Sequence, residues 1–268
     1  MFCISGLRII PRAAEAMDRR IVSENGFPEN ILDAQRDHFS VYLKISIQFP
    51  ELFPPGDGDG MSSCKLVQIH GVFMNEQRID DALALVSKFQ DITKNVGEHF
   101  RCRLVGFDTQ EAPCEPAPGR IQRLVPVPQH FWKLGRDFLT SQLNQLRGSL
   151  QQSEVILLCD CYGRDVYERL LVDLRGVKRR GSDEEELQTS LGRFEMARRF
   201  LENGVAHPTY QSYSDDTLIR AFVTARENGK GAFGDPESRP FNHPSEYRRK
   251  RRQMVIDMRR ETRPRYKE

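Results

Sequence analysis

The chain has 268 residues, of which 38% are hydrophobic and 29% are charged, and its formal net charge is +2. These values are ordinary for a globular protein that buries a core in one or two domains. No apolar run approaches the roughly 20 residues that cross a bilayer, so the sequence predicts no transmembrane helix and no membrane partner.

The positive charge is concentrated near the C-terminal end. Residues 238 to 268 hold 11 Lys and Arg against 4 Asp and Glu, whereas the rest of the chain is slightly acidic. We therefore separate residues 237 to 268 as a basic tail, which suits an arm for nucleic acid, an import signal, or both. An intracellular protein is favoured, and nuclear and mitochondrial compartments both stay open.

Motifs for organic cofactors and zinc are not found in the sequence. There is no Walker loop and no GxGxxG, so no organic cofactor is expected. The six cysteines include no CxxC pair, and no secretory signal precedes them. We therefore expect reduced, mostly structural thiols and no zinc site.

The first part of the chain predicts one clear strand. Residues 1 to 62 are taken as an N-terminal extension of unknown role, with a possible helix over residues 13 to 21. Within it, residues 39 to 49 alternate strictly between apolar and polar side chains, which predicts a half-buried strand. A loop rich in Pro and Gly, residues 54 to 60, ends that strand.

The next elements frame an arginine-led strand. Residues 65 to 74 predict a strand. Residues 75 to 92 carry an apolar stripe at helical spacing, so a helix is favoured there, although residues 82 to 89 could instead pair with a strand over residues 99 to 107.

The second half alternates helices with a hairpin. A helix is predicted over residues 131 to 146, and strands over residues 154 to 159 and 164 to 174 form a hairpin. Residues 177 to 192 are polar and charged and are taken as an exposed insertion. Helices follow over residues 193 to 203 and 215 to 228, the second with Ser214 as its N-cap.

The residues at the end of the arginine-led strand suit attack on a phosphate. Arg103 stands five residues before Asp108, and Glu111 follows three residues later. On this logic Asp108 and the backbone carbonyl of Thr109 bind a divalent metal ion, Glu111 activates water, and Arg103 binds the phosphoryl oxygens. Arg164, at the hairpin turn, supplies a second cation. The alternative is a surface ion pair worth at most ~1 kcal/mol.

The order of these motifs resembles the staphylococcal-nuclease-like (thermonuclease) family. In that family an Arg-led strand ends in Asp-Thr/Ala-Pro-Glu, a helix follows, and a strand hairpin turns at Asp-x-Tyr-Gly-Arg. Here the first motif runs from Arg103 to Glu111, with Gln110 in place of the proline, and the second runs from Asp160 to Arg164. We take residues 63 to 236 as the nuclease-like domain.

The resemblance implies a fold and an activity. The fold would be α+β, an OB-type five-stranded β-barrel with about three helices. The activity would be calcium-dependent endonuclease cleavage of DNA or RNA, with Ca²⁺ as the metal and single-stranded nucleic acid as the partner. Tyr210 falls where a tyrosine of the family contacts the substrate.

The resemblance also implies a second metal-binding Asp, in a turn Asp-Gly-Asp-Thr before the Arg-led strand. Asp81 has suitable neighbours but lacks the Gly and the Thr, and it is the residue we select. Asp59 matches literally in Asp57-Gly-Asp59 but lies far upstream, and Asp91 has no turn signal. If none of them binds metal, the domain is instead a catalytically impaired module that binds nucleic acid or serves as a scaffold.

Overall fold

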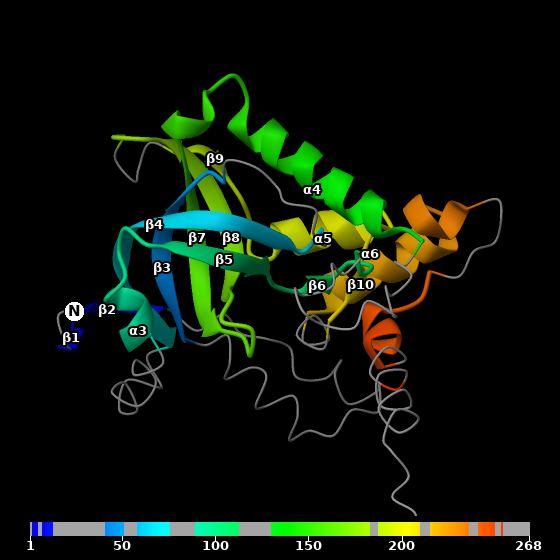
Figure 1. The fold of residues 1–268 in the computed structure, drawn as a ribbon, viewed down its shortest axis with the longest axis horizontal. Helices are drawn as coiled ribbons and strands as arrows, with labels where there is room; N and C mark the ends of the chain where they lie inside the picture. The colour runs from blue at the N-terminus through cyan, green and yellow to red at the C-terminus, as the bar shows by residue number, and fades with distance from the viewer. Residues whose placement is uncertain are drawn as a thin grey trace, which may run out of the picture.

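Figure 1 presents a computed structural model of the chain. The structure describes residues 2–4, 7–12, 41–50, 58–75, 89–112, 130–182, 187–209, 215–235, 241–249 and 253. The helix suggested over residues 13 to 21 lies outside these residues, as do residues 76 to 88 of the predicted helix over 75 to 92.

The fold is α+β, with a large and mostly antiparallel sheet (Figure 1). Its main path runs β1-β2-β4-β3-β7-β8-β5, β9 pairs with β8, and a separate pair joins β10 to β6. The strands are β1 (Phe2–Ile4), β2 (Leu7–Arg12), β3 (Val41–Gln48), β4 (Gly60–Asn75), β5 (His99–Leu104), β6 (Phe107–Asp108), β7 (Val155–Arg164), β8 (Leu170–Arg179), β9 (Leu187–Ser190) and β10 (His207–Pro208).

Five of these strands pair in a partly closed ring. β4 pairs with β5 as well as with β3, so the pairings run from β4 through β3, β7, β8 and β5 back to β4. The predicted strands over residues 39 to 49, 65 to 74 and 99 to 107 correspond to β3, β4 and β5, although β5 ends at Leu104 and residues 39 and 40 are not described. The predicted hairpin is present, but its second strand was placed too early. β7 continues to Arg164, and β8 begins only at Leu170. The expected boundary after residue 62 falls within β4, and β3 pairs with both β4 and β7. The sheet therefore continues across that boundary.

The burial of β3 differs from the prediction of a half-buried strand. Its apolar face is buried, and its polar face is partly covered by packed side chains: Tyr42 and Ser46 are buried, whereas Lys44 and Gln48 are half-buried. Tyr42 stacks on Phe73 with a centroid distance of 5.3 Å. Ser46, only 1% exposed, forms a hydrogen bond of 2.6 Å with His70. The polar face of β3 is therefore more buried than its alternating sequence predicts.

The helices follow the sequence closely. α4 buries its apolar face, and α6 begins at Asp215, whose carboxylate accepts a hydrogen bond from the Thr217 amide. The predicted N-cap was one residue earlier, at Ser214, which is not described. Among the described residues, no helix is long and apolar enough to cross a membrane. The helices are α3 (Gln90–Thr93), α4 (Trp132–Arg147), α5 (Glu195–Glu202) and α6 (Asp216–Glu227).

The predicted exposed insertion over residues 177 to 192 is wrong in its described parts. β8 continues to Arg179, Val177 is fully buried, and β9 adds to the edge of β8. The charged residues misled the prediction because one of them, Lys178, is itself buried next to Val177 and donates to the Ser182 carbonyl. Residues 183 to 186 lie outside the described part of the chain.

The thiol prediction holds where it can be checked. Cys64, Cys102, Cys159 and Cys161 are buried and form no disulfide. Burial and neighbouring thiols raise the pKa of Cys159 well above its ordinary value, so it is protonated and unreactive at neutral pH.

Candidate functional site

The arginine at the end of β5 lies between two carboxylates. The antiparallel register pairs Arg103 with Gly60 at the start of β4, so Asp59 comes next to Arg103. The backbone fixes this placement, because the Leu104 amide donates to the Asp59 carbonyl at 2.8 Å. Arg103 Nη2 lies 3.1 Å from Asp59 Oδ2 and 3.0 Å from Asp108 Oδ1.

The second carboxylate is positioned by a turn and a short strand pair. Gly106 has a φ of +92°, and a Cβ there would lie 2.9 Å from the Cβ of Ala197. Glycine therefore lets the chain turn closely past α5 between β5 and β6. In β6, Asp108 pairs with His207 of β10, which leaves Asp108 only 3% exposed.

A close contact between two glycines holds Asp59 in place. A Cβ on Gly58 would lie 2.2 Å from the carbonyl carbon of Gly135 in α4. In turn, a Cβ on Gly135 would lie 2.8 Å from Cγ2 of Thr109. The turn that carries Asp59, the first turn of α4, and the residue after Asp108 therefore pack directly on one another.

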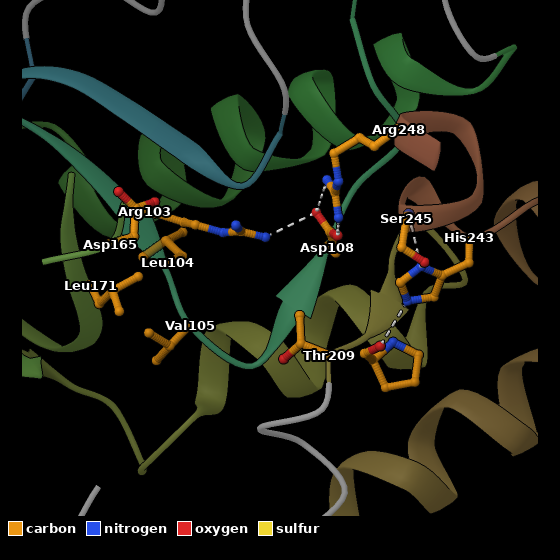
Figure 2. A pocket seen from close by; sticks show the side chains of 11 residues that line it. Arg103, Leu104, Val105, Asp108, Asp165, Leu171, Thr209, His243, Ser245 and Arg248 are labelled. Atoms are coloured by element: carbon orange, nitrogen blue, oxygen red, sulfur yellow. Dashed lines mark hydrogen bonds and ion pairs between the residues drawn. The ribbon is translucent and has the colours of Figure 1, made fainter. Parts of the chain in front are cut away.

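A guanidinium from the basic tail completes the cluster. Arg248 lies in a short helical segment, residues 244 to 249. Its Nη2 lies 2.5 Å from Asp108 Oδ2, and its Nη1 donates to Glu111 Oε1. Figure 2 shows Arg103 and Arg248 reaching Asp108 from different sides. Within the described chain, three carboxylates thus meet two guanidinium groups.

The pKa shifts follow from this arrangement. Burial raises the pKa of Glu111, although Arg248 acts in the opposite direction. For Arg248, burial would lower the pKa, but the bonds to Asp108 and Glu111 outweigh it and raise the pKa. Arg103 behaves likewise, because Asp59 and Asp108 offset its desolvation and its pKa is raised. Both arginines are therefore charged at every physiological pH.

The cluster opens into a cavity of about 420 Å³, within the range of small-ligand sites. Arg103, Asp108 and Arg248 line one side (Figure 2). Thr209, His243 and Ser245 also line the cavity, so hydroxyl and imidazole groups share it with the charged cluster. An anionic group of the size of a phosphate could reach both arginines from this cavity.

The structure brings some of the site residues predicted from the sequence together and places others elsewhere. Arg103, Asp108, Thr109 and Glu111 come together. Arg164 does not line the cavity, because its guanidinium lies over the Phe100 ring and 2.9 Å from Glu168. Its role as a second cation stays a prediction.

The three candidates for the second metal-binding Asp also differ in where they lie. Asp81 and Tyr210 lie outside the described residues, and Asp91 is exposed in α3. Asp59, which matched the family turn literally, is the candidate beside Arg103. Sequence reasoning missed Arg248, because nothing distinguishes it from its neighbours in the run Arg248 to Arg252.

The donor atoms suit a hard divalent cation, since carboxylate oxygens are what Ca²⁺ and Mg²⁺ prefer. Thr109 is fully buried, and its Oγ1 has no hydrogen-bond partner among the described residues. Yet no three His, Cys, Asp or Glu side chains in the described chain lie close enough to hold one ion. Arg103 lies between Asp59 and Asp108, and Arg248 lies between Asp108 and Glu111. The donors therefore fit a metal only after a guanidinium moves away from Asp108.

Comparison with known proteins adds no identification. A scan of the chain against models of protein families finds no match, and a comparison with curated proteins finds none.

Proposed function

We propose that the protein is a metal-dependent phosphodiesterase, an endonuclease that hydrolyses DNA or RNA. The observation that carries the proposal is the pairing of Arg103 with Asp59 and Asp108 beside one cavity, with Glu111 joined to Asp108 through Arg248. The planar, permanently charged guanidinium of an arginine binds phosphoryl oxygens well, and the Arg103 side chain is half-buried beside the cavity. The adjacent carboxylates supply what water activation and charge neutralisation require.

Each residue of the cluster takes a role in the proposal. Arg103 binds the phosphate, and Glu111 accepts the proton of the attacking water. Its raised pKa brings it nearer to the range of an effective general base. Asp59 and Asp108, with Thr109, hold the cation, for which we propose Ca²⁺. When bound, the cation would offset the negative charge that builds up on phosphorus.

The fold is compatible with this activity. We propose that the ring of β3, β4, β5, β7 and β8 is an OB-type barrel, a frame that often binds single strands of nucleic acid. We also propose that Arg164 acts at the substrate as a second cation and that Tyr210 packs against the substrate.

A plasmid-nicking assay with Ca²⁺, Mg²⁺ or EDTA tests the proposal. We expect cleavage only with a divalent metal, and its loss in Glu111→Gln. Arg103→Ala should lower turnover on the order of 100- to 1,000-fold, as loss of a transition-state donor does. Arg101→Ala, an exposed change on the same strand, is the matched control and should retain activity. Full activity in Arg103→Ala would refute the site.

A second candidate function is a binding module without catalysis. The observation that favours it is that Arg248 already pairs with both Asp108 and Glu111. In that case the protein would bind nucleic acid tightly without metal and would not cleave it. A gel-shift assay in EDTA beside the nicking assay separates the two functions.

A further inference from the structure

Arg248 binds Asp108, one of the proposed cation ligands, and also Glu111 beside it. Its two terminal nitrogens bond to different carboxylates, and a third, longer contact of 3.4 Å joins Nη1 to Asp108 Oδ1. Hydrogen bonds between ionised groups are roughly twice as strong as neutral ones. The guanidinium is therefore held firmly, even though about a third of its side chain remains exposed.

The chain before Arg248 is anchored by contacts that do not involve its side chain. Phe241 packs on the His207 ring at 4.2 Å, and Gln110 Nε2 donates to the Asn242 carbonyl at 3.1 Å. His243 Nε2 donates to the Pro208 carbonyl at 3.2 Å. Arg248 can thus leave the carboxylates while the preceding residues stay docked, which keeps its effective concentration at the site high.

Charge balance makes Arg248 and a divalent cation alternatives. The described cluster has three carboxylates and two guanidinium groups, so it carries one net negative charge. Replacing Arg248 with a divalent cation would make it neutral. Adding the cation while Arg248 stays would leave two like charges on the same oxygens in a partly buried site, where such repulsion is costly.

We propose that Arg248 is a tethered competitor for the cation position, so that a divalent cation and the docked Arg248 exclude each other at Asp108 and Glu111. The proposal rests on the metal-binding part of the proposed function, which it deepens by assigning the site a built-in regulator. The uncomplexed chain holds itself in the closed, guanidinium-bound form. Cation binding releases residues 244 to 249, and the apparent cation affinity falls with the fraction of closed chain.

The test measures Ca²⁺ binding to the full chain by titration calorimetry, with CaCl₂ as the probe. Arg248→Gln and Arg248→Ala are compared with the wild type, and Arg249→Ala is the matched control, because Arg249 is exposed and carries the same charge. We expect Ca²⁺ affinity to increase at least about tenfold in both Arg248 variants, which corresponds to about 1.4 kcal/mol, and little in the control. Circular dichroism verifies that each variant is folded.

A second measurement needs no variant. Hydrogen exchange, read by mass spectrometry, should become faster over residues 244 to 249 of the wild type when Ca²⁺ is added. Equal Ca²⁺ affinity in all chains, or slower exchange in this segment, would overturn the proposal. So would a failure of every chain to bind Ca²⁺.

The nicking assay separates this proposal from the proposed function. If the Arg248 variants bind Ca²⁺ more tightly but cut no DNA or RNA, competition stands and the endonuclease is refuted. If metal-dependent cleavage occurs with equal Ca²⁺ affinity in all chains, the endonuclease stands and competition is refuted.

Discussion

Asp59 and Arg103 form an ion pair of 3.1 Å across neighbouring strands, and Asp59 is only 3% exposed. A buried carboxylate needs a charged partner to stay ionised without a large cost. Arg103 supplies that partner and shares it with Asp108. The pairing makes Asp59, rather than Asp81 or Asp91, the proposed second metal-binding carboxylate.

Replacing Asp59 with Asn should weaken Ca²⁺ binding at least about tenfold, because a neutral amide replaces one charged oxygen ligand. Calorimetric titration measures the change. Asp91→Asn, in the exposed α3, is the control, and Asp81→Asn tests the other sequence candidate. Loss of binding in Asp81→Asn but not in Asp59→Asn would reject our assignment.

Gly58→Ala should destabilise the protein by about 1–3 kcal/mol, the usual cost of overpacking. The added Cβ would meet the backbone of Gly135 at 2.2 Å, and backbone cannot yield as a side chain can. Urea denaturation measures the loss. Gly192→Ala is the control, since its Cβ would meet only Glu195 Oε2, at 3.8 Å. Equal stability of the two variants would contradict the tight contact.

His207 should make the protein sensitive to mild acid. Burial, then His243, lowers its pKa from 6.5 to about 4, so the folded state binds a proton less readily than the unfolded state. The corresponding stability is complete above pH 6.5 and is lost as the pH falls towards 4, at ~1.4 kcal/mol per pKa unit. His207→Phe should flatten this acid limb of the stability curve. If the free energy of unfolding of His207→Phe falls as steeply as that of the wild type between pH 6.5 and pH 4, His207 is not the cause of the acid sensitivity.

Asp173 should make the protein less stable as the pH rises, the opposite of the effect of His207. Burial raises its pKa to about 7, although it accepts a hydrogen bond from the Phe194 amide at 2.9 Å. The proton is then held more tightly in the folded state, so the contribution is complete below pH 3.8 and is lost as the pH rises towards 7.

Asp173→Asn keeps an acceptor for the Phe194 amide but cannot ionise. Relative to the wild type, its free energy of unfolding should increase between pH 4 and pH 7. Denaturant titrations at several pH values measure this difference, which isolates Asp173 from other titrating groups. A constant difference across that range would show that Asp173 does not titrate there.

The sequence predicted best those parts of the site whose residues lie close together along the chain. Arg103, Asp108 and Glu111 lie on one short stretch, so their spacing was enough to group them. Asp59 depends on the register between β4 and β5, and a literal motif in a Pro/Gly loop gave little reason to prefer it. Arg248 reaches the site only through packing of the tail, which no local pattern in a run of basic residues encodes.

The same contrast between local patterns and distant packing explains which parts of the fold could be predicted. Strand and helix positions followed from periodicity, whereas their burial did not. Tyr42 and Ser46 were expected to face solvent because they are polar, but a stacked ring and an imidazole partner bury them. The buried Val177 was hidden among charged residues for a similar reason.

The contact between Gly58 and Gly135 links two places that sequence alone would treat as independent. Since neither position has room for a side chain, a substitution at one cannot be offset by a smaller residue at the other. Distant relatives of this chain should therefore keep the pair together or lose it together. An Asp-Gly-Asp turn before a strand, matched by a glycine in the first turn of the later helix, becomes a signature for finding them.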